Sequence, residues 1–186
     1  EMIRSGRLGE ISYVDVWAPE GSGSPVKPDD KIIPDGFDFD RWLGPAPLAE
    51  YSFARCRSAT GVYHTYDYAI GFIAGWGAHP LDIAVWGVKE KMNDISSHKG
   101  TGSLFPEGML FDTITSWDVN IKYNKGLTVH FMSTDLARPV VSEYLPDMAG
   151  DGTAFFGEKG WISISRGQIA SNIPEIHNEL NVGVVG

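Results

Sequence analysis

The alternation of apolar and polar positions is strongest between residues 117 and 132. Segment 117–123 reads WDVNIKY, with an apolar side chain at every second position. Segment 127–132 resumes the alternation after Asn124-Lys125-Gly126, whose glycine suits the left-handed position of a three-residue hairpin loop. Since a period of two places alternate side chains on opposite faces of a strand, the pattern predicts an antiparallel hairpin with one apolar and one polar face.

Shorter runs of β-branched and aromatic residues predict the rest of a sheet. The expected strands are Ile11–Trp17, Asp94–Gly102, Ala154–Phe156, Trp161–Ser165 and Gln168–Ser171, with a turn at Gly157–Gly160 between the third and the fourth. With the hairpin these make about six strands, not counting the short segment Gln168–Ser171, and they accompany one convincing internal helix. The pattern predicts a single α+β domain over residues 1–186, a predominantly antiparallel open sheet with a helix packed on one face.

The internal helix is predicted from a change of period after residue 78. Apolar side chains recur at positions 81, 84, 85 and 88, which is helical spacing. Pro80 is the expected first helical residue, because its fixed φ and its missing N–H suit that position. Lys89–Lys91 end the run with the basic residues that helix C-termini favour.

His79 is the candidate catalytic residue. It directly precedes the expected helix start, where the positive end of the helix dipole favours the neutral imidazole that a general base needs. Gly75 and Gly77 allow backbone or ligand to approach closely. Asp82 has two interpretations: it supplies a carboxylate near His79, or it lies in the first helical turn and caps backbone donors.

Aromatic and polar residues in two further segments are candidates for binding a sugar. Rigid rings suit the apolar faces of sugars, and hydroxyl groups and carboxylates suit a polyol. The candidate substrate-binding residues are Trp42, Tyr66, Asp67, Trp76 and Asp82. For Trp42 an equal alternative is that the ring pins its loop to the core. Residues 19–34, rich in Gly, Ser, Pro and Asp, are expected to form a surface loop.

Composition excludes several classes of function. The net charge of −9 argues against a nucleic-acid partner, and the chain contains no apolar run of membrane-spanning length. Cys56 is the only cysteine, which excludes an intrachain disulfide and a cysteine-based zinc site and is compatible with cytoplasm or periplasm. No metal is expected, since His79 and Asp82 would need His64 or His98 close in space. No dinucleotide-binding Gly-x-Gly-x-x-Gly motif is present.

Four segments together resemble the C-terminal substrate domain of the glucose–fructose oxidoreductase and inositol dehydrogenase family (Gfo/Idh/MocA). They are Ile3–Ile11, Trp42–Pro47, Gly77–Asp82 and Phe156–Gly160. The resemblance implies a preceding Rossmann domain that binds NAD or NADP, so that residues 1–186 are an internal or C-terminal piece of a two-domain oxidoreductase. The opening Glu1–Gly6, interpreted as the last turn of a helix, and the apolar end of the chain agree with this expectation.

The resemblance also implies roles for single residues. In the family, the histidine that matches His79 lies beside the reacting carbinol and takes part in proton transfer while hydride moves to the nicotinamide. Many members carry an aspartate four residues before this histidine, where this chain has Gly75. The usual pair of aspartate and histidine is therefore altered here.

Three hypotheses of function follow. The first is a pyridine-nucleotide oxidoreductase acting on a sugar, a glycoside or a cyclic polyol. The second is a glycosidase or lyase that uses bound NAD for transient oxidation of the sugar ring. The third is a module for assembly without catalysis, since in the family the open face of the sheet pairs subunits and a homo-oligomer is expected. Under all three, this chain by itself is expected to bind neither NAD nor NADP.

Overall fold

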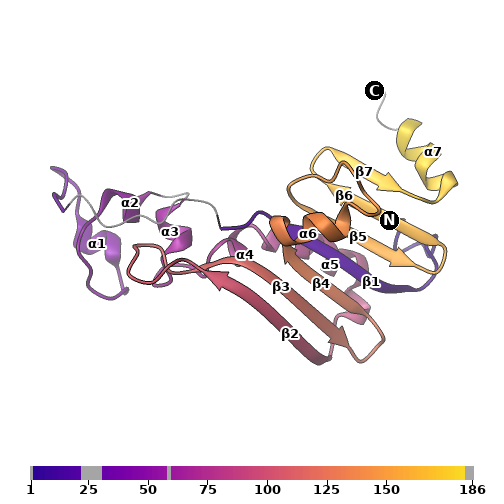
Figure 1. Ribbon diagram of the computed structural model, residues 1–186, viewed down its shortest axis with the longest axis horizontal. Coiled ribbons are helices and arrows are strands. Elements are labelled where there is room, and N and C mark those ends of the chain that lie inside the picture. Colours follow the sequence, from indigo (N-terminus) through magenta and orange to yellow (C-terminus); the bar gives the residue numbers. More distant parts are fainter. Residues whose placement is uncertain (1, 22–30, 58–59, 183–186) are drawn as a thin grey trace.

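A seven-stranded open sheet forms the centre of the computed structural model, which describes residues 2–21, 31–57 and 60–182 (Figure 1). The strand order is β2-β3-β4-β1-β5-β6-β7. The strands are β1 (Ile11–Ala18), β2 (Ile95–Leu104), β3 (Ile114–Tyr123), β4 (Thr128–Ser133), β5 (Gly152–Gly157), β6 (Gly160–Ser165) and β7 (Gln168–Ser171). The predicted α+β class with a mostly antiparallel sheet is confirmed, with seven strands where about six were expected.

The predicted hairpin of residues 117–132 is confirmed as β3 and β4, with Val119 opposite Phe131. One pair, β1 with β4, is parallel and places Val14 opposite Val129. A parallel pair needs a long crossover connection, which the chain between β1 and β4 provides. The remaining neighbours in the sheet pair antiparallel.

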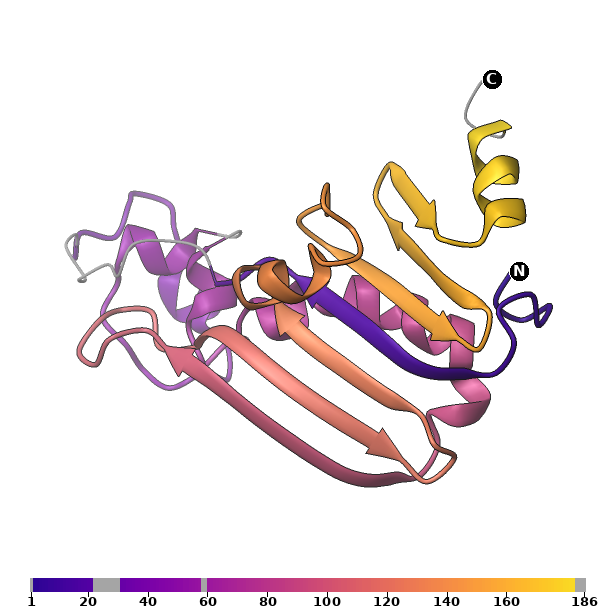
Figure 2. The same cartoon turned by 45° about the vertical axis from the view of Figure 1, so that its right-hand side comes forward.

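Helices lie against both faces of the sheet, as the turned view shows (Figure 2). The helices of the described residues are α1 (Phe39–Leu43), α2 (Phe53–Cys56), α3 (Gly61–His64), α4 (Phe72–Gly75), α5 (Ala78–Val88), the 3-10 helix η1 (Lys89–Lys91), α6 (Thr134–Val141) and α7 (Pro174–Val182). Of these, α5 and α6 lie against opposite faces of the sheet, whereas α1–α3 lie beyond its end (Figure 1). The expectation of one internal helix is wrong. Helix α6 follows β4 directly and contains Pro139, a residue that disfavours the interior of a helix, so the sequence did not indicate it.

The sheet separates two hydrophobic clusters. On one face, α5 packs against β1 and β5, and its Ala84 and Val88 belong to one cluster with Val14, Val129 and Phe155. On the other face, α6 covers one end of the strands and buries Trp17, Met132, Ala137 and Val141. The indole of Trp17 donates to the carbonyl of Ala149 at 2.9 Å, which satisfies its buried N–H.

The beginning of the described chain forms turns and not a helix. Residues 2–8 form turns, with φ of 76° at Gly6, so the expected last turn of a helix is not a regular helix. Most of the predicted loop 19–34 lies outside the described residues. Within residues 2–21, 31–57 and 60–182, no helix has the length and apolar character needed to span a bilayer.

Phe155 should dominate the stability of the α5 side of the core. Its side chain is fully buried between the sheet and α5, so Phe155→Ala should lower the free energy of unfolding by about 3–5 kcal/mol in urea denaturation. Phe53→Ala is the matched control, because Phe53 is 61% exposed and its loss should cost within about 0.5 kcal/mol. Equal losses for the two variants would contradict this assignment of the core.

Candidate functional site

His79 lies within α5 and not ahead of it. Helix α5 begins at Ala78, two residues before the predicted start, and α4 ends only at Gly75. The N–H of Gly77 donates to the carbonyl of Phe72 and that of His79 to the carbonyl of Trp76. The two helices are thus joined by a short irregular turn, and the backbone N–H of His79 is already satisfied.

The glycines before His79 serve packing. A Cβ atom on Gly75 would lie 2.6 Å from Cε1 of Tyr63, and one on Gly77 would lie 2.5 Å from Cζ of Phe131. Real Cβ atoms do not approach other atoms so closely, so a side chain at either position would displace an aromatic ring. The space that an aspartate at position 75 would enter is therefore occupied by the ring of Tyr63.

Three side chains gather around the first turn of α5. The rings of Trp76 and His79 meet edge to face with centroids 5.7 Å apart. The guanidinium carbon of Arg166, from the turn between β6 and β7, lies 4.7 Å from the centre of the Trp76 ring. His79 and Arg166 are exposed, and Trp76 is half-buried. Sequence reasoning missed Arg166, since nothing in a two-residue turn 87 positions beyond His79 signals the contact.

Asp82 does not cap the helix. It is the fifth residue of α5, and the helix has no acidic residue in its first turn and no side-chain cap. The capping interpretation is wrong because α5 begins earlier than Pro80 suggested. Asp82 is exposed one turn beyond His79, so its proposed contact with a substrate stays a prediction.

Trp42 and Asp67 line a different pocket, of about 500 Å³, together with Tyr68. The Trp42 ring stacks on Phe39 at 5.8 Å and meets Tyr68 edge to face at 5.2 Å. Trp42 thus both borders a pocket and anchors its segment. None of the described residues lining this pocket is Trp76, His79 or Asp82, and α1 stands away from α5 in both views (Figures 1 and 2).

Tyr66 lies next to that pocket in sequence and is exposed. Its backbone N–H donates to the carboxylate of Asp112 at 2.7 Å, which holds the residue beside the loop after β2. The structure therefore divides the predicted binding residues into two groups. Trp76, His79 and Asp82 share the α4–α5 segment, whereas Trp42, Tyr66 and Asp67 belong to the segment of α1–α3.

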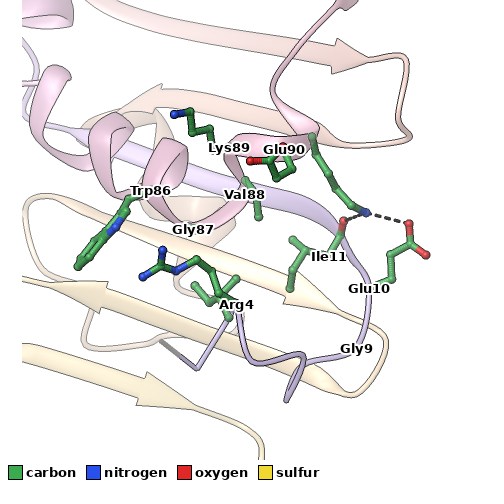
Figure 3. Close-up of a pocket in the computed structure, with 11 residues that line it drawn as sticks. Arg4, Gly9, Glu10, Ile11, Trp86, Gly87, Val88, Lys89 and Glu90 are labelled. Carbon is green, nitrogen blue, oxygen red and sulfur yellow. Dashed lines mark hydrogen bonds and ion pairs between the residues drawn. The ribbon is translucent and has the colours of Figure 1, made fainter.

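A larger pocket of about 600 Å³ opens at the other end of α5 (Figure 3). Lys91 closes one side, donating to Glu10 and to the carbonyl of Ile11 at 2.8 Å each. On the other side the guanidinium of Arg4 lies 5.4 Å from the ring of Trp86, which is 67% exposed. Trp86 lies seven residues from His79, about 10 Å along the helix axis. The pocket is thus separate from the His79 site.

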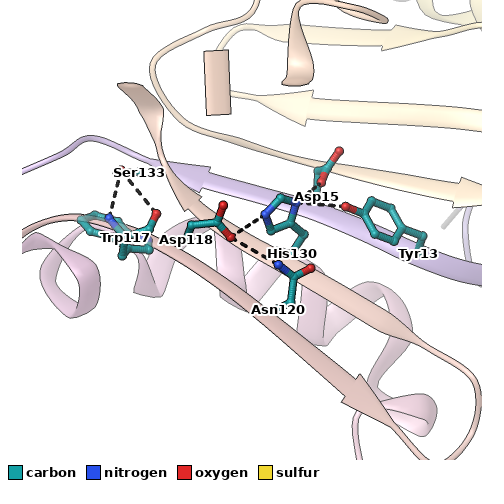
Figure 4. Close-up of polar contacts among 7 residues, drawn as sticks. All are labelled: Tyr13, Asp15, Trp117, Asp118, Asn120, His130 and Ser133. Carbon is teal, nitrogen blue, oxygen red and sulfur yellow. Dashed lines mark hydrogen bonds and ion pairs between the residues drawn. The ribbon is translucent and has the colours of Figure 1, made fainter. Parts of the chain in front are cut away.

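A polar network occupies the opposite face of the sheet (Figure 4). We use the name polar sheet face for the surface formed by Tyr13 and Asp15 of β1, Asp118 of β3 and His130 of β4. His130 Nε2 lies 2.9 Å from Asp118, and His130 Nδ1 lies 3.0 Å from the Tyr13 hydroxyl and 3.5 Å from Asp15. Tyr144 donates to the other oxygen of Asp15 at 3.0 Å.

Burial and charge oppose each other at His130. Burial lowers the pKa of the imidazole, but the hydrogen bonds and negative charges of Asp15 and Asp118 outweigh it and leave the pKa raised. Burial and the charge of Asp15 also raise the pKa of Tyr13 and of Tyr144, so both phenols stay protonated. The sequence predicted one polar face for the hairpin of residues 117–132 and did not predict a network on it. A charged residue inside the apolar strand β1, Asp15, was the signal that could have revealed the network.

The other histidines do not assemble a metal site in the described residues. His64 is fully buried with its ring against Phe72, Phe105 and Phe111. His98 is exposed on β2. No three His, Cys, Asp or Glu side chains of residues 2–21, 31–57 and 60–182 are placed to hold one ion.

The chain combines an open, mostly antiparallel sheet with α5 on one face and an exposed histidine in the first turn of that helix. Residues 17–135 match the family model described as "Oxidoreductase family, C-terminal alpha/beta domain", of the Gfo/Idh/MocA type. The match covers more than half of the chain, which therefore belongs to the Gfo/Idh/MocA oxidoreductase family. No curated protein sequence matches the chain.

Several solved structures share the fold, two of which hold NADH together with a second ligand. The WlbA dehydrogenase from Bordetella pertussis, in complex with NADH and UDP-GlcNAcA, has a TM-score of 0.55 and 13% identity, covering 98% of this chain and 43% of that one. An inositol dehydrogenase homolog from Azotobacter vinelandii, complexed with NADH and myo-inositol, has a TM-score of 0.53 and 18% identity, covering 93% and 35%. This chain spans less than half the length of either protein.

The ion pairs of His130 should make stability depend on pH. Because its folded-state pKa is raised, they stabilise the fold fully below the unfolded value of about 6.5 and lose this contribution as the pH rises through the folded-state pKa. In urea denaturation, the advantage of the wild type over His130→Gln should therefore be larger at pH 6 than at pH 9.

Asp118→Asn is the control for this prediction. It removes one of the two carboxylates that face His130, so the pH-dependent part of the advantage should shrink in that background. An advantage of His130 that is equal at both pH values would contradict the assignment of the network.

Proposed function

We propose that this chain is the substrate domain of an NAD(P)-dependent oxidoreductase that acts on a sugar, a glycoside or a cyclic polyol. The observation that carries the proposal is the exposed imidazole of His79 beside the half-buried ring of Trp76, at the start of the helix that faces away from the polar sheet face. Membership of the oxidoreductase family supports it. The relatives in complexes with NADH hold myo-inositol and UDP-GlcNAcA, a cyclic polyol and a nucleotide sugar.

The described residues fit one half of such a site. His79, Trp76 and Arg166 offer a proton carrier, an apolar ring and a cation on one open surface. The sequence has no Gly-x-Gly-x-x-Gly motif of the kind that holds a pyrophosphate. The two solved structures that hold NADH are more than twice as long as this chain, so we assign the dinucleotide to a further domain of the longer protein, where its nicotinamide would accept the hydride.

In this proposal His79 moves the proton. The imidazole accepts the proton of the substrate hydroxyl as the carbinol carbon loses hydride, and it returns the proton in the reverse direction. Trp76 meets the imidazole edge to face and limits its rotation. Tyr63 closes the space above Gly75, so a carboxylate does not assist from that position.

Removing the imidazole tests this role. In the longer protein that carries this domain, His79→Ala should lower kcat by roughly 10²–10⁴-fold, the contribution of a positioned acid or base. His98→Ala is the matched control, since His98 is exposed on edge strand β2 and should leave kcat unchanged. Hydride transfer is followed as NADH or NADPH absorbance over a panel of sugars, and a His79→Ala variant with full activity would refute the role.

The same assay separates the alternatives. Cleavage of a glycoside without accumulation of NADH would favour the glycosidase or lyase over the dehydrogenase. Lack of dinucleotide binding by the longer protein would favour a module for assembly.

We further propose that two copies associate through the polar sheet face. On this surface the side chains of His130 and Asp15 are largely buried, and hydrogen bonds hold them in place. The rings of Tyr144 and Phe156 lie beside them. This ordered surface supports the proposal. Helix α6 covers only one end of this face. A second copy would cover the remainder.

A charge placed on that face should weaken association. Thr128 lies opposite Tyr13 in β1 and shares the face of His130, so Thr128→Arg should raise the dissociation constant of the oligomer by at least about tenfold in light scattering. His98→Arg is the matched control. His98 pairs with Ile121 of the apolar cluster and so lies on the α5 side of the sheet. The added charge there should leave the dissociation constant of the oligomer unchanged. A monomeric wild type would contradict the proposal.

A further inference from the structure

Arg166, Trp76 and His79 form one continuous row on the surface of the domain. The guanidinium carbon of Arg166 lies over the Trp76 ring, 4.7 Å from its centre. The Trp76 ring in turn meets the His79 ring edge to face, with their centroids 5.7 Å apart. Two elements far apart in sequence supply the row, the β6–β7 turn and the α4–α5 segment.

The sheet positions this turn beside α5. Thr153 of β5 donates to the carbonyl of Pro80 at 2.7 Å, in the first turn of α5. Thr153 is paired with Ile164 of β6, which lies only two residues before Arg166. Ser165 and Gln168 pair across the turn, and Gly167 supplies a φ of 78° there. The position of Arg166 is therefore fixed by the strand register.

The edge of the Arg166 guanidinium is available for a ligand. Among the described residues, no carboxylate oxygen lies within 4.0 Å of its nitrogen atoms, and α5 carries no acidic residue in its first turn. The contact of the guanidinium with the Trp76 ring is a cation–π interaction, which forms no hydrogen bond to the guanidinium N–H groups. These N–H groups match the two oxygens of a carboxylate or a phosphate.

We infer that Arg166 and Trp76 form a subsite for an anionic group of the substrate, a carboxylate or a phosphate carried by a sugar whose hydroxyl reaches His79. The inference rests on the proposed function and narrows its substrate class to acidic sugars. The hydroxyl groups of a neutral polyol accept hydrogen bonds from a guanidinium but do not neutralise its charge. An acidic sugar can place a carboxylate or a phosphate on Arg166 while its hydroxyl reaches His79, on the other side of Trp76.

A second explanation of the row is that Arg166 only holds the Trp76 ring in place. In that case its loss would affect neutral and anionic sugars equally. The two explanations therefore differ in charge selectivity.

The test measures binding of three probes to the 186-residue chain by NMR titration at constant ionic strength: glucuronate, glucose 6-phosphate and glucose. The variants are Arg166→Gln, which removes the charge, and Arg166→Lys, which keeps the charge without the planar fork. Arg4→Gln is the matched control, since Arg4 stacks on Trp86 at the other end of the same helix. Circular dichroism confirms that each variant is folded.

We expect the wild type to bind at least one anionic probe more tightly than glucose. Arg166→Gln should raise the dissociation constant of that probe by at least about tenfold, Arg166→Lys should raise it less, and Arg4→Gln should leave it unchanged. The preferred probe identifies a carboxylate or a phosphate as the group bound. An equal loss for glucose and the anions, or no binding of either anion, overturns the subsite.

The binding of the probes and the turnover of substrate test the two proposals separately. Failure of His79→Ala to lower kcat would count against the proposed function while Arg166 still selected anions. Turnover of anionic sugars that Arg166→Gln leaves unchanged would leave the proposed function intact and refute the subsite.

Discussion

The close contact of α5 with the sheet is the constraint on which the candidate site depends. Gly77 and Gly87 face the rings of Phe131 and Phe155, and a Cβ atom at either glycine would lie within 2.6 Å of the ring. Any side chain there would push the helix away from a close-packed interior. His79 keeps its position over the sheet because the backbone of α5 approaches the aromatic rings directly.

The central strand β1 connects two chemistries on opposite faces. Val14 and Val16 face the apolar cluster under α5, and Tyr13 and Asp15 face the polar network around His130. A carboxylate that is 2% exposed is costly unless donors surround it, which explains why Tyr144 and His130 converge on Asp15. The proposed proton transfer and the proposed association therefore use separate surfaces of one sheet.

Local patterns predicted most strands, because period-two alternation survives in any sheet with one apolar face. They predicted the helix boundary less well. The preference of proline for the first helical position suggested a start at Pro80, but the helical backbone already begins at Ala78 after α4. This difference of two residues is enough to remove Asp82 from the first turn, which is why its expected cap does not exist. Helix α6 was missed because its amphipathic turns follow β4 without a polar loop.

The sequence alone determined the class of fold, the hairpin of β3 and β4, and the family resemblance around His79. Only the tertiary structure decided which side chains surround that histidine. Arg166 reaches Trp76 through strand register, Tyr63 fills the space above Gly75, and Trp42 lies in another pocket. Periodicity specifies the face on which a side chain lies but not the strand that becomes its neighbour, because strand order depends on long-range packing.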